Sequence, residues 1–307
     1  MRISGFALAQ VLFMGVVAAA PMEAWQWPVP VPAISRTFGQ DAGGYLMRGM
    51  EFAAGAQPVY PVEAGVVVAA HEASDAGLPS GLGSYVVIEH DQEFRSIYAH
   101  LEAEFLPAIG QRVGAETQIG VVGESGLVAG RALRLYIIDL ESGEYVNPVL
   151  LLPDLEDAVS PSIGAIYARS ADALYDLRQT RSLPAGDYEI TATIEDGVRR
   201  NGDPEPLAPY SVRVFVGGQE SFHVVMDRIL SGPDGTRLEP GGAAAQSLYG
   251  VDGLYRLGRV TVGAGETQLE VVVNDFAGNE TSRSLVLRPR AVGGEADGPA
   301  PGGTEEP

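Results

Sequence analysis

The chain has 307 residues and a formal net charge of −20, with 40 acidic and 20 basic residues. This excess of carboxylates argues against nucleic acid or an anionic membrane surface as the main partner, because both attract clustered basic side chains. Cys is absent, which excludes disulfides, thiolate metal sites and cysteine nucleophiles. The 39 glycines and 21 prolines favour a turn-rich β structure over a helical bundle.

The first 24 residues have the composition of a signal peptide. Met1-Arg2 is a short basic start, and Ile3–Ala20 is apolar and ends in small residues, as secretory signals do. An uncleaved membrane anchor is the alternative, since the apolar stretch is near the lower length for a membrane span. Both interpretations place the rest of the chain outside the cytoplasm and predict no other membrane contact.

Residues 25–153 contain short apolar runs interrupted by glycine and proline. No amphipathic run of helical period separates these runs, so parallel strand–helix–strand units are not expected. The pattern predicts an antiparallel β sandwich or barrel. The predicted strands cover Val59–Val62, Gly65–Ala70, Ser84–His90, Arg95–Leu101, Gln118–Gly123 and Leu133–Leu140.

Residues 154–161 form a polar, proline-bounded linker, after which strand-like segments resume. Tyr188, Ile190, Ala192 and Ile194 alternate with polar residues, which predicts strands with one buried face and one wet face. We therefore expect residues 162–290 to form an immunoglobulin-like β sandwich. Residues 291–307 are acidic and nearly free of large apolar side chains, and we expect them to be disordered.

The most informative stretch is Ser84–Leu101, which predicts two strands joined by a polar turn and ends in Tyr98-Ala99-His100-Leu101. That ending, with the motifs around it between Trp25 and Pro153, resembles the lysostaphin-type (LytM-like) zinc endopeptidases, which cut peptidoglycan cross-bridges. The resemblance implies an all-β fold with a duplicated hybrid motif. Its other markers are Trp27-Pro28-Val29, Phe38-Gly39, Gly49-Met50-Glu51-Phe52, Gly65-Val66-Val67, Gly110-Gln111-Arg112-Val113 and Asn147-Pro148.

Members of that family hold one zinc ion with the His and Asp of an H-x-x-x-D element and the second His of an H-x-H element. These ligand positions are Met47, Glu51 and Arg134 here, and the first His of H-x-H, catalytic in the family, is Ala132. A thioether is a poor zinc ligand and a guanidinium has no lone pair to give. The resemblance thus implies a degenerate site without zinc or another cofactor, in which His100 remains from the catalytic set.

We expect Met47, Glu51, His100 and Arg134 to line a remnant groove, with no metal ligand set and no complete catalytic set. A salt bridge between Glu51 and Arg134 is predicted, because a guanidinium–carboxylate pair would restore local charge balance where the cation would sit. An open groove would favour ligand binding, whereas a groove plugged by Tyr45 would favour a scaffold.

Other sites are weaker candidates. We interpret His90 as structural, and a rebuilt metal site from His71, His90 and His100 lacks any ligand-spaced pair. The acidic stretch Asp154–Asp157 has the residue types that bind calcium, but it lacks a loop pattern with defined ligand spacing.

The sequence therefore predicts an exported, non-catalytic LytM-like protein of a bacterial periplasm or cell surface. It would bind peptidoglycan or a partner protein such as a cell-wall hydrolase. An active peptidoglycan metalloendopeptidase with an altered metal site is one alternative. A structural envelope module that binds through its immunoglobulin-like domain is another.

Overall fold

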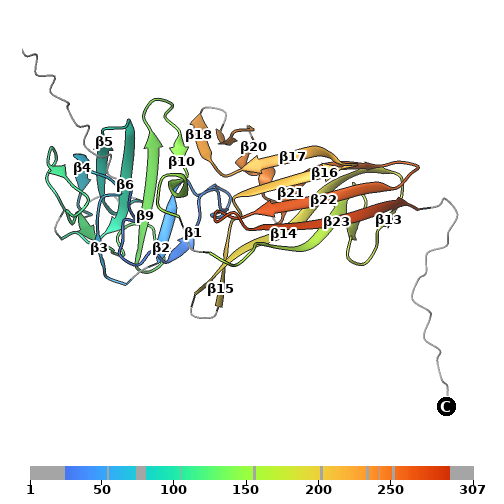
Figure 1. The fold of residues 1–307 in the computed structure, drawn as a ribbon, viewed down its shortest axis with the longest axis horizontal. Helices are drawn as coiled ribbons and strands as arrows, with labels where there is room; N and C mark the ends of the chain where they lie inside the picture. The colour runs from blue at the N-terminus through green and yellow to red at the C-terminus, as the bar shows by residue number, and fades with distance from the viewer. Residues whose placement is uncertain are drawn as a thin grey trace, which may run out of the picture.

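The computed structural model describes residues 25–290, except 54, 74–80, 105, 155–156, 201–202, 233–234, 242 and 251–252. The predicted signal segment and the predicted acidic tail lie outside the described residues. The described chain forms two β-rich lobes that follow one another along the long axis (Figure 1). Its helical elements are the short helix α1 (Ala245–Leu248) and the 3-10 turn η1 (Pro148–Leu150). Neither has the length and apolar character that crossing a membrane requires.

The N-terminal lobe, which we define by strands β1–β10, is built on one antiparallel sheet. In the described chain this sheet runs in the order β10-β9-β6-β5-β4-β7, with β2 added beside β9 and β1 beside β2. The short strands β3 and β8 pair with each other. The strands are β1 Ile34–Arg36, β2 Met50–Ala53, β3 Pro58–Val59, β4 Gly65–His71, β5 Ser84–His90, β6 Phe94–Leu101, β7 Arg112–Val113, β8 Gly120–Val121, β9 Ala132–Asp139 and β10 Tyr145–Val146.

The predicted hairpin over Ser84–Leu101 is present as β5 and β6. Val86 pairs with Tyr98 and Ile88 with Ser96 in an antiparallel register. Val86, Ile88 and Tyr98 are fully buried in the core of this lobe. The Tyr98 hydroxyl accepts a hydrogen bond from the Val62 backbone N–H at 2.7 Å, which satisfies the polar end of a buried ring.

The C-terminal lobe, which we define by β11–β17 and β21–β23, contains two sheets. One has the order β12-β11-β14-β15 with β21 beside β14, and the other has the order β13-β23-β22-β16-β17. Apolar side chains from both sheets form one hydrophobic cluster. The strands are β11 Ser162–Arg169, β12 Leu174–Asp176, β13 Ser182–Leu183, β14 Gly186–Arg200, β15 Asp203–Leu207, β16 Ser211–Val216, β17 Gln219–Val225, β21 Tyr255–Val262, β22 Thr267–Asn274 and β23 Glu280–Pro289.

Three strands from the C-terminal half of the sequence join the N-terminal sheet instead. They are β18 (Arg228–Gly232), β19 (Gly235–Glu239) and β20 (Ala243–Ala244), and β18 pairs directly with β10. This pairing satisfies backbone groups of β10 that would otherwise form an open sheet edge. The Arg228 guanidinium reinforces the junction through the carboxylates of Asp139 at 2.7 Å and Glu144 at 3.1 Å.

The cores of the two lobes also exchange residues. Phe38 and Leu46, from the N-terminal part of the chain, belong to the C-terminal cluster, and Leu207 of β15 belongs to the N-terminal one. We expected residues 162–290 to form a module of their own after a linker. Strand pairing and core packing nevertheless connect residues on both sides of the predicted linker, because these contacts join segments that are far apart in sequence.

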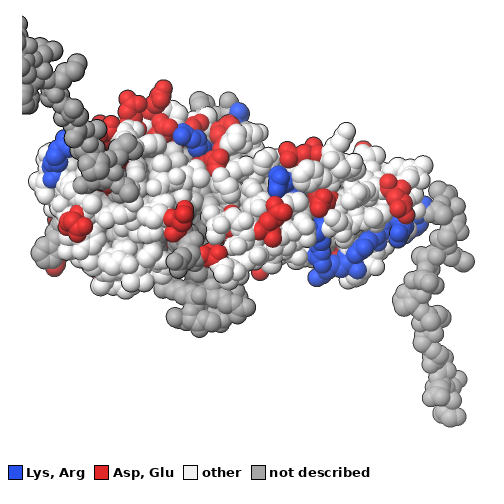
Figure 2. Space-filling view, viewed as in Figure 1, with Lys and Arg blue, Asp and Glu red and all other residues white. Residues whose placement is uncertain are grey.

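Charged side chains are distributed unevenly over the surface. Figure 2 shows acidic side chains spread over both lobes, while basic ones gather along one edge of the C-terminal lobe. In that lobe, Arg178, Arg181 and Arg283 line a pocket of about 250 Å³.

Candidate functional site

Strands β2 and β9 bring Glu51 and Arg134 together. The two residues are direct partners in the antiparallel register, so their side chains lie on the same face of the sheet. Arg134 Nη2 donates to Glu51 Oε2 at 2.5 Å, and the side chains are only 13% and 11% exposed. Gly49 permits the close approach of this segment to β9, because a Cβ there would lie 2.2 Å from the Leu135 carbonyl oxygen. The predicted salt bridge is confirmed.

Strand β1 supplies two further contacts to the Glu51 carboxylate. Ser35 Oγ donates to Glu51 Oε1 at 3.2 Å, and Arg36 Nε lies 3.6 Å from the same oxygen. The sequence analysis missed both residues, since only the pairing of β1 with β2 places them beside Glu51. We call Ser35, Arg36, Glu51 and Arg134 the ion-pair site.

The contacts of Arg134 favour its charged form. Burial by itself would lower the pKa of Arg134, but its hydrogen bond to Glu51, its interaction with Tyr136 and the charge of the Glu51 carboxylate together outweigh burial, so the pKa is raised. A guanidinium held in this way stays positively charged at any physiological pH.

Met47 and Arg134 line a pocket of about 240 Å³ beside the ion pair. Met47 is buried at 3% exposure, whereas Tyr45, which also lines the pocket, is 59% exposed. The pocket wall is largely aromatic and aliphatic, with a second guanidinium from Arg48. Its remaining lining residues are Leu46, Leu82, Ile97, Tyr136 and Tyr145. Of the four residues predicted to share a groove, Glu51 and His100 are outside this lining.

His100, the penultimate residue of β6, has an unusual backbone conformation. Its φ is +66°, in the left-handed region that non-glycine residues seldom adopt, and it is fully buried. The backbone N–H of His100 donates to the Leu82 carbonyl oxygen, and its Nδ1 lies 2.8 Å from the Ser125 carbonyl oxygen. Because a carbonyl only accepts, Nδ1 carries the proton and Nε2 has a free lone pair. Nε2 is buried without a partner among the described residues.

The pKa of His100 is lowered. Burial is the main cause, the hydrogen bond to Ser125 opposes it, and the charges of Arg134 and Glu51 act in opposite directions. Ala99, which precedes His100, pairs with Arg134 across β6 and β9, so His100 lies near the ion-pair site. The imidazole is therefore neutral at pH 7, with an unpartnered acceptor nitrogen.

The residues at the family ligand positions do not fit zinc. Met47 offers only a thioether, Glu51 is already engaged by Arg134, and Arg134 adds a positive charge where a cation would sit. Ala132 is buried at 3% exposure and has no donor atom. A tetrahedral site needs at least three nitrogen, oxygen or sulfur ligands, and this set supplies one carboxylate.

The other histidines do not rebuild such a site. Among the described residues, His71, His90 and His100 do not gather within ligand distance of one another. His90 is 4% exposed, with Nδ1 3.0 Å from the Ala64 carbonyl oxygen and Nε2 2.8 Å from Ser96 Oγ. These two hydrogen bonds occupy both ring nitrogens and agree with the structural interpretation of His90.

The part of the chain that contains Glu51 and Arg134 matches a known protein family. Residues 45–148 match the model of the family described as Peptidase family M23. The N-terminal lobe carries an M23 peptidase-like domain. A second family model, whose description names no function, matches residues 160–289.

Related proteins cover the chain only in part. The outer membrane antigenic lipoprotein B of Haemophilus influenzae is 30% identical over 139 residues, which are 45% of this chain and 31% of that protein. The match therefore spans about a third of the length of this relative.

Solved structures are similar to part of the chain. A zinc-containing peptidase from Vibrio cholerae is 25% identical with a TM-score of 0.34, covering 39% of this chain and 38% of that one. The catalytic domain of lysostaphin from Staphylococcus simulans is 20% identical with a TM-score of 0.33, covering 39% and 90%. The SpoIIQ–SpoIIIAH pore-forming complex matches at 21% identity and a TM-score of 0.36, covering 43% and 92%.

Proposed function

We propose that this chain is an exported protein of the bacterial cell envelope whose M23 peptidase-like domain is non-catalytic and acts by binding. The ion pair between Glu51 and Arg134 is the observation that carries the proposal. It occupies two of the positions where the family holds zinc, and it satisfies their charge within the protein. Without a metal ion, no activated water is available for peptide hydrolysis in the manner of this family.

The pocket beside the ion pair supports a binding role. Tyr45, Tyr136 and Tyr145 provide ring faces, and Arg48 provides a cation whose guanidinium carbon lies 5.4 Å from the ring centre of Tyr145. Aromatic faces suit sugar rings and apolar side chains, while a guanidinium suits a carboxylate. Peptidoglycan contains all three, so it is our first candidate ligand, and an envelope protein such as a cell-wall hydrolase is the second.

The location and the finer fold belong to the same proposal. The signal-like start of the chain and the outer-membrane name of the Haemophilus influenzae relative support export to the periplasm or cell surface. We propose a lysostaphin-type sandwich with a duplicated hybrid motif for the N-terminal lobe. For the C-terminal lobe, two sheets around one core support an immunoglobulin-like sandwich.

Metal content and peptidoglycan cleavage test the non-catalytic role. The full protein is incubated with zinc, dialysed and measured by mass spectrometry, and its cleavage of purified peptidoglycan is followed with and without chelator. We expect no stoichiometric zinc and no cleavage. Stoichiometric zinc with chelator-sensitive cleavage would instead establish the altered metalloendopeptidase.

A variant that restores the family ligand types serves as the positive control. The triple variant Met47→His/Glu51→Asp/Arg134→His places two imidazoles and a shorter carboxylate at the three family ligand positions. We expect this variant to retain zinc after dialysis where the natural chain does not. If both retain zinc equally, the metal is bound elsewhere and the ion pair does not decide the chemistry.

Co-sedimentation with purified peptidoglycan tests the binding role. Tyr45→Ala removes an exposed ring from the pocket without touching the ion pair, and we expect roughly tenfold weaker binding, as for a contact residue of ordinary strength. Leu174→Ala, at a 52% exposed position on β12 of the C-terminal lobe, is the matched control. Unchanged binding by Tyr45→Ala would move the binding surface away from the pocket, and a loss of binding in Leu174→Ala alone would favour the C-terminal lobe.

A further inference from the structure

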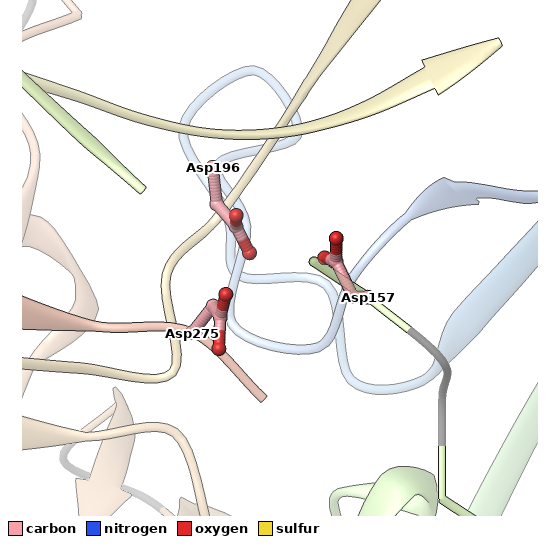
Figure 3. Close-up of side chains that lie close together, drawn as sticks. All are labelled: Asp157, Asp196 and Asp275. Carbon is pink, nitrogen blue, oxygen red and sulfur yellow. The ribbon is translucent and has the colours of Figure 1, made fainter. Parts of the chain in front are cut away.

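Three aspartates from separate segments meet beside the junction of the two lobes. Asp157 lies between η1 and β11, Asp196 lies on β14, and Asp275 directly follows β22. One carboxylate oxygen from each lies within 4.8 Å of those of the other two. Figure 3 shows the three side chains converging on a common space. We call them the aspartate site.

These carboxylates are buried without a compensating positive charge. Asp196 is 3% exposed and Asp275 is 2% exposed, while Asp157 is half-buried. In the part of the chain that the structure describes, no Arg or His forms an ion pair with any of the three. Carboxylates withdrawn from water are normally paired with a cation or bound to a metal ion.

One carboxylate oxygen of the aspartate site is buried without a binding partner among the described residues. Asp196 Oδ1 is buried and has no hydrogen-bond partner among the described residues, and the side chain extends toward the space shared with Asp157 and Asp275. Burial and the negative charges of Asp275 and Asp157 raise the pKa of Asp196 to about 7. A cation in that space would satisfy the oxygen and remove the repulsion.

The surrounding hydrogen bonds hold the other two carboxylates in place. The backbone N–H of Asn279 donates to Asp275 Oδ1 at 2.8 Å, and its side-chain Nδ2 donates to Asp275 Oδ2 at 2.8 Å and to the Asp157 carbonyl oxygen at 3.1 Å. The backbone N–H of Val159 donates to Asp157 Oδ1 at 2.8 Å. Each carboxylate oxygen has two lone pairs, so every one of these oxygens keeps a lone pair for a cation.

We propose that Asp157, Asp196 and Asp275 bind one Ca²⁺ ion that fastens the inter-lobe segment to the C-terminal lobe. The donor set consists only of carboxylate oxygens, which suits a hard divalent cation and not zinc. Oxygens that all lie within 4.8 Å of one another fit within the diameter of a Ca²⁺ coordination shell, whose bonds measure about 2.3–2.6 Å and whose geometry is flexible, whereas Mg²⁺ demands a near-ideal octahedron. Backbone oxygens or water would complete the coordination.

The site explains how the junction is held. Asp157 belongs to the segment that leaves the N-terminal lobe, whereas Asp196 lies on β14 in one sheet of the C-terminal lobe and Asp275 directly follows β22 of the other sheet. One ion therefore connects three segments that otherwise repel one another. This inference concerns the stability of the junction and does not depend on whether the M23-like domain binds or cleaves its ligand.

Calcium titration of the full-length protein tests the proposal. Thermal unfolding is measured in chelator and with CaCl₂ up to about 10 mM, at constant ionic strength. A dissociation constant of about 0.1–1 mM is typical of extracellular calcium sites. Calcium binding with this affinity would raise the melting temperature by about 3–8 °C at the highest CaCl₂ concentration. MgCl₂ at the same concentration should give a smaller shift, and isothermal titration calorimetry should show saturable binding of Ca²⁺.

Two single-residue variants identify the site. Asp196→Asn should abolish the calcium-induced shift while remaining folded, because it removes a repelling charge. Glu195→Gln changes the adjacent carboxylate, which is exposed on the same strand, and should keep the full shift. The proposal fails if the natural protein shows no calcium-dependent shift, or if Asp196→Asn keeps the shift of the natural protein.

Discussion

The ion-pair site and the aspartate site both contain buried carboxylates, but they balance charge in opposite ways. Glu51 faces Arg134 and Arg36 and receives a hydrogen bond from Ser35. The carboxylates of the aspartate site face one another and have no positive partner among the described residues. The first site is complete within the protein, and the second requires something from outside. A family resemblance would place the metal at the first site, whereas the local electrostatics place it at the second.

Simple energetics support this contrast. Two like charges within 4.8 Å of one another repel by at least about 3 kcal/mol at an effective dielectric constant near 20. That is a substantial fraction of the stability of a typical domain. A buried guanidinium–carboxylate pair, by contrast, is destabilising mainly when one partner is removed. Removal of one charged group should therefore lower the free energy of unfolding at the ion-pair site and raise it at the aspartate site.

The largest effect is expected from breaking the balance at the ion-pair site. Arg134→Met leaves Glu51 with only the more distant Arg36, and we expect the free energy of unfolding to fall by about 2–4 kcal/mol. Urea denaturation at pH 7 measures this change. The double variant Glu51→Gln/Arg134→Met should recover part of the loss, because it no longer leaves a buried charge unpaired.

An exposed pair provides the control for that measurement. Arg288 and Glu266 form a salt bridge of 2.9 Å with side chains that are 62% and 61% exposed. Arg288→Ala should change stability little, since exposed pairs contribute only about 0–1 kcal/mol. Equal losses in Arg288→Ala and Arg134→Met would show that the ion-pair site is not a buried, balanced cluster.

A smaller effect of opposite sign is expected at the aspartate site. In chelator at pH 7, Asp196→Asn should raise the free energy of unfolding by about 1–2 kcal/mol, because it removes one of three mutually repelling charges. Urea denaturation with chelator present measures the gain, and Glu195→Gln should stay within about 0.5 kcal/mol of the natural protein. Destabilisation by Asp196→Asn in chelator would mean that the carboxylates do not repel as the structure indicates.

The smallest effect on stability is expected from His90, a buried histidine whose neutral form is favoured. Burial lowers the pKa of His90 below its ordinary value of 6.5, against the opposing effects of Ala64 and Asp91. The folded protein therefore binds this proton less readily than the unfolded chain, so stability is complete above pH 6.5 and declines as pH falls below it. We expect the loss of stability caused by His90 to develop as the pH falls from 7 to 5.

The pH dependence of unfolding in two histidine variants measures this contribution. His90→Gln should flatten the acid-side decline relative to the natural protein, whatever stability it loses at pH 7. His71→Gln, at an exposed position, should leave the decline unchanged. A decline that persists fully in His90→Gln would assign the acid sensitivity to other groups.

Long, regular strands could be predicted closely from the sequence. The predicted strand over Ser84–His90 is β5, and the one over Leu133–Leu140 is β9 shifted by one residue. The predictions over Val59–Val62 and Gln118–Gly123 were too long, since β3 and β8 have two residues each. Within the described residues those two strands pair only with each other, and a propensity for extended backbone does not reveal how many residues find a partner.

The ion-pair site and the aspartate site differ in how far they could be predicted from the sequence. Glu51 and Arg134 were predicted to pair because motif positions identified them as neighbours. Asp157 was noted only within an acidic stretch, and Asp196 and Asp275 were not recognised at all. They come from different strands and loops, and no sequence spacing links them.

The sequence by itself determined the β-rich character of the chain, the M23-like motif order and the side chains of Met47 and Arg134 at two positions that the family resemblance identifies as ligand positions. Those properties depend on local patterns and on the chemistry of single side chains. Only the tertiary structure decided that β18 completes the N-terminal sheet, that Ser35 and Arg36 join the ion-pair site, and that three distant aspartates share one space. Such arrangements result from strand pairing and close packing between segments far apart in the chain, which no local pattern records.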